Sequence, residues 1–260
     1  MLDDRALIVI RRRSYPEILD LALLLFRLRA RSIGLAALAG IAPFAVLDAW
    51  LLESDILPRS AWFGLVFLEI PFATAPLSLV LSDALFRIRI RPAAIARRLA
   101  SGLPGLIVWS LIVRPLLWIS VVGIPFALAR MPYTVEVVLL ERVPFSRFWR
   151  RTAVLARGAE GSMMLRQLAA VVLGLVFVRC FMFGIGSLAA VFVGEDVSWS
   201  RDLEPGLWRS LLVQSSVWIA VGFFGLARFL IYIDRRIRLE GWDLELRLRA
   251  VARKIERQIE

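Results

Sequence analysis

The sequence contains no histidine, a single cysteine, Cys180, and a single lysine, Lys254. Without histidine, no imidazole-dependent catalytic dyad can form, and zinc sites built on histidine or on several cysteines are excluded, as are intramolecular disulfides. The sequence also lacks the carboxylate cluster of a metal-dependent phosphotransferase, a glycine-rich phosphate loop and the nucleophile elbow of hydrolases. We therefore expect no cofactor, no metal and no enzymatic activity.

Apolar residues are abundant, at 59% of the 260 residues, and the mean hydropathy is +0.72. Soluble globular domains contain only about 45 to 50% apolar residues. Several stretches lack charge over most of roughly 20 residues, the length at which a helix crosses about 30 Å of hydrocarbon. The sequence therefore predicts an all-α, polytopic membrane bundle of about six transmembrane helices.

The net charge is +11, and almost all of the positive charge is arginine, as is typical of GC-rich bacterial genomes. The arginines cluster between apolar stretches, where the positive-inside bias and anionic headgroups account for them. No basic domain stands apart from the membrane, so we expect no nucleic-acid partner. The expected partners are a bilayer with anionic headgroups and, in addition, a protein partner or a second copy of the chain.

A transmembrane bundle is predicted over residues 32–233. Its six spans cover about 32–52, 61–86, 103–121, 124–140, 168–193 and 211–233. The arginine-rich loops place both termini on the cytoplasmic side of a bacterial inner membrane. Span 61–86 contains Pro71 and Pro76 and is expected to be kinked or interrupted.

The apolar stretch 103–140 is too long for one crossing at about 1.5 Å per residue. Arginine clusters flank it on both sides, and flanks of like charge require an even number of crossings. We expect two helices that turn near Gly123 and Pro125. A re-entrant hairpin is the alternative.

Three segments are expected outside the spans. The first, 1–31, contains an interfacial helix capped by Ser14, unless this helix is an extension of the first span. The second, 143–158, is a basic amphipathic helix between spans, lying on the cytoplasmic surface, and the third, 234–260, is a helical cytoplasmic tail. The expected contacts of the second segment with lipid headgroups are Arg147, Arg150, Arg151 and Arg157.

Two stretches of the chain carry a family resemblance. The matching residues of the first are Gly123, Ile124 and Pro125, in altered order, and Pro132, Tyr133, Glu141, Arg151, Thr152, Leu155 and Gly158. Those of the second, at the exit of the last span, are Tyr232, Asp234, Arg236, Arg238, Glu240, Gly241, Asp243 and Leu244. This pattern resembles bacterial multi-span membrane proteins named after the membrane domain of glycerophosphodiester phosphodiesterases. The resemblance implies a six-span architecture with no established chemistry, because the soluble catalytic domain is absent.

Ionisable groups within the spans are the functional candidates, since each costs several kcal/mol in hydrocarbon unless it is paired or hydrated. The candidate intramembrane polar site consists of Glu69, Arg114, Glu136, Arg179 and Arg228. Their expected depths predict that Glu69 pairs with Arg114 or Arg179, and that Glu136 pairs with Arg228. Such pairs either hold the bundle together or serve as an anion, lipid-phosphate or proton site.

These features favour a non-enzymatic membrane scaffold or accessory subunit that contacts anionic lipids and a partner. The alternative is a small transporter or channel lined by the intramembrane ion pairs, and a membrane enzyme ranks third. A polar cavity that reaches Arg114 and Arg179 would favour transport, whereas a dry bundle would favour the scaffold.

Overall fold

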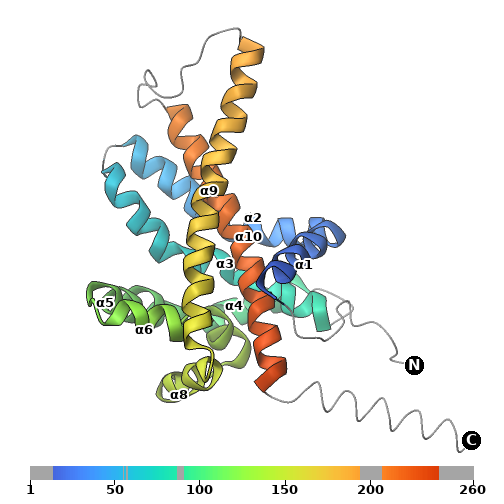
Figure 1. Cartoon of the computed structure of the whole chain (residues 1–260), viewed down its shortest axis with the longest axis vertical. Coiled ribbons are helices and arrows are strands. Elements are labelled where there is room, and N and C mark those ends of the chain that lie inside the picture. The colour runs from blue at the N-terminus through green and yellow to red at the C-terminus, as the bar shows by residue number, and fades with distance from the viewer. Residues whose placement is uncertain (1–13, 55, 57, 87–90, 194–206, 240–260) are drawn as a thin grey trace, which may run out of the picture.

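The computed structural model describes residues 14–54, 56, 58–86, 91–193 and 207–239, and every regular element among them is a helix (Figure 1). The predicted all-α class is therefore confirmed. Residues 1–13 of the predicted N-terminal segment and 240–260 of the predicted tail lie outside the described residues.

The described residues form α-helices and two π-helices. In chain order they are α1 (Tyr15–Leu28), α2 (Ala30–Glu53), α3 (Arg59–Phe86), α4 (Pro92–Ile107), the π-helix η1 (Val108–Val113), α5 (Arg114–Ile119), α6 (Gly123–Arg130), α7 (Thr134–Glu136), the π-helix η2 (Val137–Glu141), α8 (Phe145–Ala156), α9 (Glu160–Val193) and α10 (Leu207–Leu239).

Five helical segments in the described residues are long and apolar enough to cross a membrane, and a bent pair of shorter helices brings the number to six if it counts as one span. The chain is thus a multi-pass membrane protein. The predicted spans 32–52, 61–86, 168–193 and 211–233 fall within α2, α3, α9 and α10. The expected interruption of span 61–86 is absent, because α3 continues as one helix through both of its prolines.

The apolar hairpin turns where it was expected, since α5 ends at Ile119 and α6 begins at Gly123. Gly123 is required there, because a Cβ would lie 2.1 Å from the Leu117 carbonyl oxygen. Both arms differ from the prediction. The first starts earlier, at Pro92, and the second is not one helix but bends by 58° between α6 and α7–η2. Pro132 lies at the bend, and a proline cannot donate the backbone hydrogen bond that would continue the helix.

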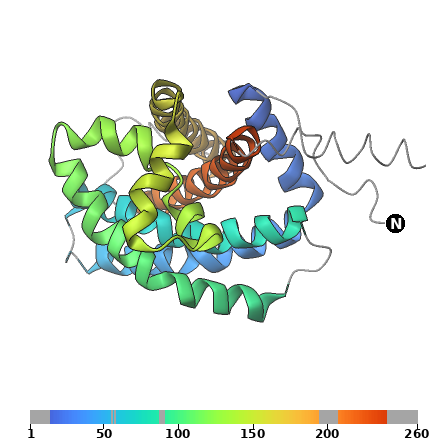
Figure 2. The same ribbon diagram turned by 90° about the horizontal axis from the view of Figure 1, so that it is seen from below.

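The N-terminal helix is separate from the first span. The Ser14 backbone N–H donates to the Glu17 carboxylate at 3.2 Å, as a capping box requires. Helix α1 ends at Leu28, and Figure 2 shows it turning away from α2. Ile18, Ala22 and Leu25 are buried along its inner face, so α1 packs on the bundle rather than extending the first span.

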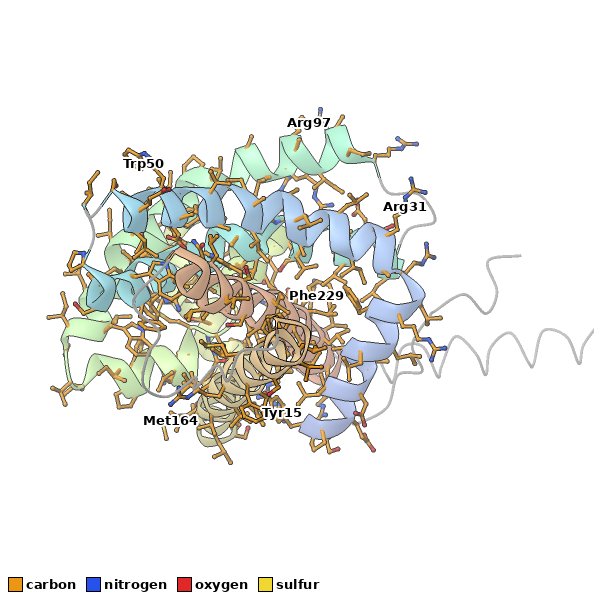
Figure 3. All side chains as sticks on the ribbon, turned by 90° about the horizontal axis from the view of Figure 1, so that it is seen from above. Tyr15, Arg31, Trp50, Arg97, Met164 and Phe229 are labelled. Atoms are coloured by element: carbon orange, nitrogen blue, oxygen red, sulfur yellow. The ribbon has the colours of Figure 1, made fainter. Side chains whose placement is uncertain are left out.

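The centre of the bundle is formed by α3 and α10, whereas α9 lies on the outside. Figure 3 shows Phe229 of α10 in the interior and Arg31 and Arg97 at the outer edge. Beyond Met163, no described side chain of α9 is buried. The long apolar surface of α9 is therefore left for lipid or a partner.

A close backbone contact joins α2 to the central helix α3. A Cβ on Gly40 would lie 2.0 Å from the Ala73 carbonyl oxygen, whereas a Cβ on Gly34 of the same helix would meet nothing within 4 Å. Small residues permit such approaches between membrane helices.

We expect Gly40→Ala to lower the free energy of unfolding by about 1–3 kcal/mol, because α2 must move away from the α3 backbone. Gly34→Ala is the matched control and should leave stability unchanged or slightly raised, since alanine favours helix over glycine. The measurement is unfolding of the purified protein in mixed detergent micelles. Equal effects of the two substitutions would contradict the close contact.

Candidate functional site

The apolar face of α8 packs on the protein itself. The Phe148 ring stacks on Trp109 of η1 with ring centres 3.6 Å apart, and Phe145 stacks on the same indole at 4.8 Å. Phe148, Leu155 and Thr152 are buried. The predicted amphipathic helix is confirmed, but the buried part of its apolar face covers the hairpin rather than lipid.

A group of three residues, Glu141, Arg151 and Tyr232, joins α8 to η2 and α10. We call it the Glu141 anchor. Arg151 forms a two-pronged ion pair with Glu141, with Nη2 and Oε1 2.7 Å apart, and the Tyr232 hydroxyl donates to Oε1, also at 2.7 Å. Arg235 adds a hydrogen bond from Nε to the Leu155 carbonyl at 2.8 Å. The orientation of α8 is thus set by polar contacts in its middle and at its C-terminal end.

The four arginines predicted to contact headgroups therefore separate into two groups. Arg147, Arg150 and Arg157 are exposed. Arg151 is partly buried and pairs with Glu141, a protein partner that was not predicted, and its contact with headgroups stays a prediction. Helical spacing alone did not reveal the carboxylate ten residues earlier in the chain.

The predicted pair of Glu136 with Arg228 is confirmed. Arg228 Nε lies 3.1 Å from Glu136 Oε1, and Ser78 of α3 donates to the same oxygen at 3.1 Å. Arg228 also donates from Nη2 to the Thr74 hydroxyl at 2.9 Å. Glu136 is completely buried, so the pair connects α3, α7 and α10 inside the bundle.

Arg114 has a different partner from the one expected. Its Nη1 donates to the Phe67 carbonyl at 3.1 Å, and its guanidinium lies 3.8 Å from the centre of the Phe67 ring. That carbonyl is available because the residue four positions later is Pro71, which has no N–H to donate. The spacing of Phe67 and Pro71 was the signal in the sequence, and it was missed.

The predicted pairing of Glu69 with Arg114 or Arg179 is wrong. Glu69 lies about 200° around α3 from Phe67, so it faces α2 instead of Arg114. Its electrostatic neighbour there is Asp48, whose carboxylate accepts a hydrogen bond from Trp218 Nε1 at 3.2 Å. Arg179 is exposed on α9 and forms no ion pair within the described residues.

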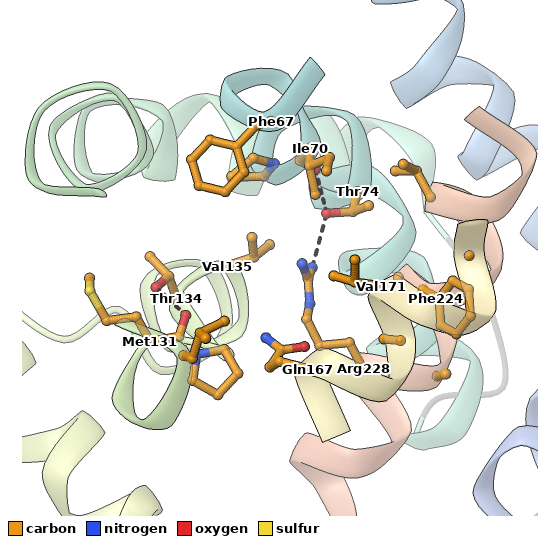
Figure 4. A pocket seen from close by; sticks show the side chains of 18 of the residues that line it. Phe67, Ile70, Thr74, Met131, Thr134, Val135, Gln167, Val171, Phe224 and Arg228 are labelled. Atoms are coloured by element: carbon orange, nitrogen blue, oxygen red, sulfur yellow. Dashed lines mark hydrogen bonds between the residues drawn. The ribbon is translucent and has the colours of Figure 1, made fainter. Parts of the chain in front are cut away.

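A cavity of about 430 Å³ lies between α3, the two arms of the hairpin, α9 and α10 (Figure 4). Its polar lining includes Arg114, Arg166, Arg228, Ser110, Thr74 and Gln167. In Figure 4 the Arg228 side chain extends from α10 toward Thr74, with the Gln167 amide beside it. The cavity reaches Arg114 and Arg228 but neither Arg179 nor Glu69, so it brings together only part of the predicted polar site.

Tyr15 of α1 also lines this cavity. Burial raises the pKa of its hydroxyl, and the positive charge of Arg166 lowers it in part. The phenol therefore stays protonated at neutral pH and is able to donate a hydrogen bond.

No arrangement for metal binding is found among the described residues. Within these residues, no group of three or more His, Cys, Asp or Glu side chains could hold an ion. The cations of the cavity favour anionic ligands instead.

Comparisons with known proteins identify no relative. No family model, curated protein or solved structure matches the chain. The resemblance to the membrane domain of glycerophosphodiester phosphodiesterases stays a prediction. The structure nevertheless brings three residues of that pattern together, because Glu141, Arg151 and Tyr232 form the Glu141 anchor.

We expect Glu141→Gln to lower the free energy of unfolding by about 3 kcal/mol, because it removes the negative charge to which the partly buried Arg151 donates twice. Tyr232→Phe removes only one hydrogen bond from the same anchor and should cost about 1 kcal/mol. Unfolding in mixed micelles measures both values. A Glu141→Gln effect no larger than that of Tyr232→Phe would show that the ion pair does not hold α8.

Proposed function

We propose that the chain is a non-enzymatic scaffold or accessory subunit of the bacterial inner membrane that binds anionic lipids through α8 and also contacts a protein partner. The observation that carries this proposal is the division of arginines on α8. Arg147, Arg150 and Arg157 are exposed, while Arg151 is used to fix the helix. A surface of guanidinium groups held in place by a rigid anchor favours phosphate headgroups.

The orientation that we propose places α8 and both termini on the cytoplasmic side. It is supported by the arginines at the ends of the helices, including Arg27 of α1 and Arg236 and Arg238 of α10. Six crossings, with the bent pair α6 and α7–η2 as one of them, keep both termini on one side. Reporter fusions that place the termini on opposite sides would refute this orientation.

The partner part of the proposal is supported by α9. Its apolar surface is uncovered, and Arg179 is exposed within it. An exposed cation within a span costs several kcal/mol unless something pairs with it. We propose that a partner helix, or a second copy of the chain, covers this face.

We expect the triple variant Arg147→Gln, Arg150→Gln, Arg157→Gln to lose most of its preference for phosphatidylglycerol over phosphatidylcholine, since each arginine near an anionic surface contributes about 1 kcal/mol. The measurement is the lipid composition retained around the protein after reconstitution in mixed bilayers, at low and high salt.

The matched control replaces the same three arginines by lysine, which keeps the charge. This control should retain a preference for phosphatidylglycerol that weakens at high salt, because salt screens the attraction between lysine and the anionic headgroup. A preference that survives the glutamine substitutions unchanged would refute the role of α8.

A transporter for an anionic substrate is the second candidate, and the cavity at Arg114 and Arg228 favours it. The substrate would have to enter and leave that cavity from opposite sides of the membrane. Counterflow of a labelled anion across proteoliposomes is therefore expected for a transporter, and it should be abolished in Arg114→Gln. A bundle that binds the anion without counterflow is not a transporter.

A further inference from the structure

The cavity has more positive charge than its surroundings neutralise. Three guanidinium groups line it, from Arg114, Arg166 and Arg228. Of these three arginines, only Arg228 pairs with a carboxylate of the described residues, that of Glu136. Arg114 instead contacts a neutral carbonyl and an aromatic ring. Arg114 and Arg228 also lie within electrostatic reach of each other. Glu136 offsets only one of the three positive charges, and the charge that remains at low dielectric favours an anion in the cavity.

An unpartnered hydroxyl lies in the same cavity. Ser110 of η1 is 1% exposed, and its Oγ has no hydrogen-bond partner. The other buried serine and threonine hydroxyls have partners: Thr74, Thr152 and Ser216 donate to a carbonyl of their own helix, and Ser78 donates to Glu136. Buried polar groups rarely stay unpaired, and π-helical turns often occur at functional sites. Ser110 is thus a donor available to a ligand.

The remaining wall of the cavity is apolar and reaches the outside of the bundle. Phe63 of α3 and Val171 and Leu175 of α9 line it and are 57%, 58% and 59% exposed. The cavity therefore opens on the apolar outer surface of the bundle. Its volume suits a headgroup and the beginning of a chain, because ligand cavities measure about 300–1,000 Å³.

We propose that this cavity binds the oxyanion of an amphiphile, a phosphate or carboxylate attached to an apolar chain. Ser110 Oγ and the free N–H groups of Arg114 and Arg228 donate to the oxyanion, and the beginning of the chain lies against Phe63, Val171 and Leu175 at the opening of the cavity. A guanidinium has five N–H donors, and Arg114 uses one of them on Phe67. The site is separate from the arginines of α8, and neither proposal requires the other.

The test is native mass spectrometry of the full chain in detergent micelles, titrated with dioleoyl phosphatidic acid, dioleoyl phosphatidylcholine or inorganic phosphate. We expect one tightly held phosphatidic acid, bound at least about tenfold more weakly by Arg114→Gln, as loss of a charge-assisted hydrogen bond implies. Arg179→Gln is the matched control, because it removes an arginine from a span outside the cavity, and it should bind as the native chain does.

Ser110→Ala keeps the proposal testable if Arg114→Gln fails to fold. It removes an unsatisfied hydroxyl, so the lipid-free protein should unfold at the same or a higher temperature, while the stabilisation by phosphatidic acid should shrink. Equal binding by Ser110→Ala, Arg114→Gln and Arg179→Gln would refute the site. Displacement of phosphatidic acid by millimolar inorganic phosphate would show that the ligand is a soluble anion, and would refute the amphiphile.

Discussion

Glu136 imposes the strongest constraint on the bundle, because a completely buried carboxylate must keep its partners. Ser78 of α3 and Arg228 of α10 both donate to one of its oxygens, and Arg228 continues to Thr74. The two central helices and the second arm of the hairpin therefore cannot separate without exposing a charge to hydrocarbon. The bend near Pro132 is part of the same constraint, since α7 carries Glu136 into this contact.

Proline provides the second constraint through the backbone acceptors that it leaves free. Pro71 does not interrupt α3, but it leaves the Phe67 carbonyl without its usual helical donor. Arg114 occupies that acceptor from the neighbouring arm of the hairpin. One missing N–H thus fixes the position of a guanidinium on another helix, and with it one side of the cavity.

Much of the fold could be predicted from apolar length and periodicity, because lipid restricts the chain to helices. Glu136 and Arg228 could also be paired from sequence, since their depths agree. Depth does not give the angle around a helix, however, and Glu69 therefore received the wrong partner. Pro132 was visible but was read within a continuous helix. The cavity and the unpartnered Ser110 depend on side-chain packing between several helices, which no local pattern encodes.

The arginines of this chain have different roles, although the sequence shows them as one excess of charge. Arg98, Arg151 and Arg228 are neutralised by carboxylates, at Asp83, Glu141 and Glu136. Arg147 and Arg150 are exposed. Arg114 belongs to neither group, because a carbonyl and an aromatic ring hold it without cancelling its charge. A cation that is fixed in position but not neutralised requires no rearrangement to receive an anion, and this preorganisation is what distinguishes a binding site from a structural ion pair.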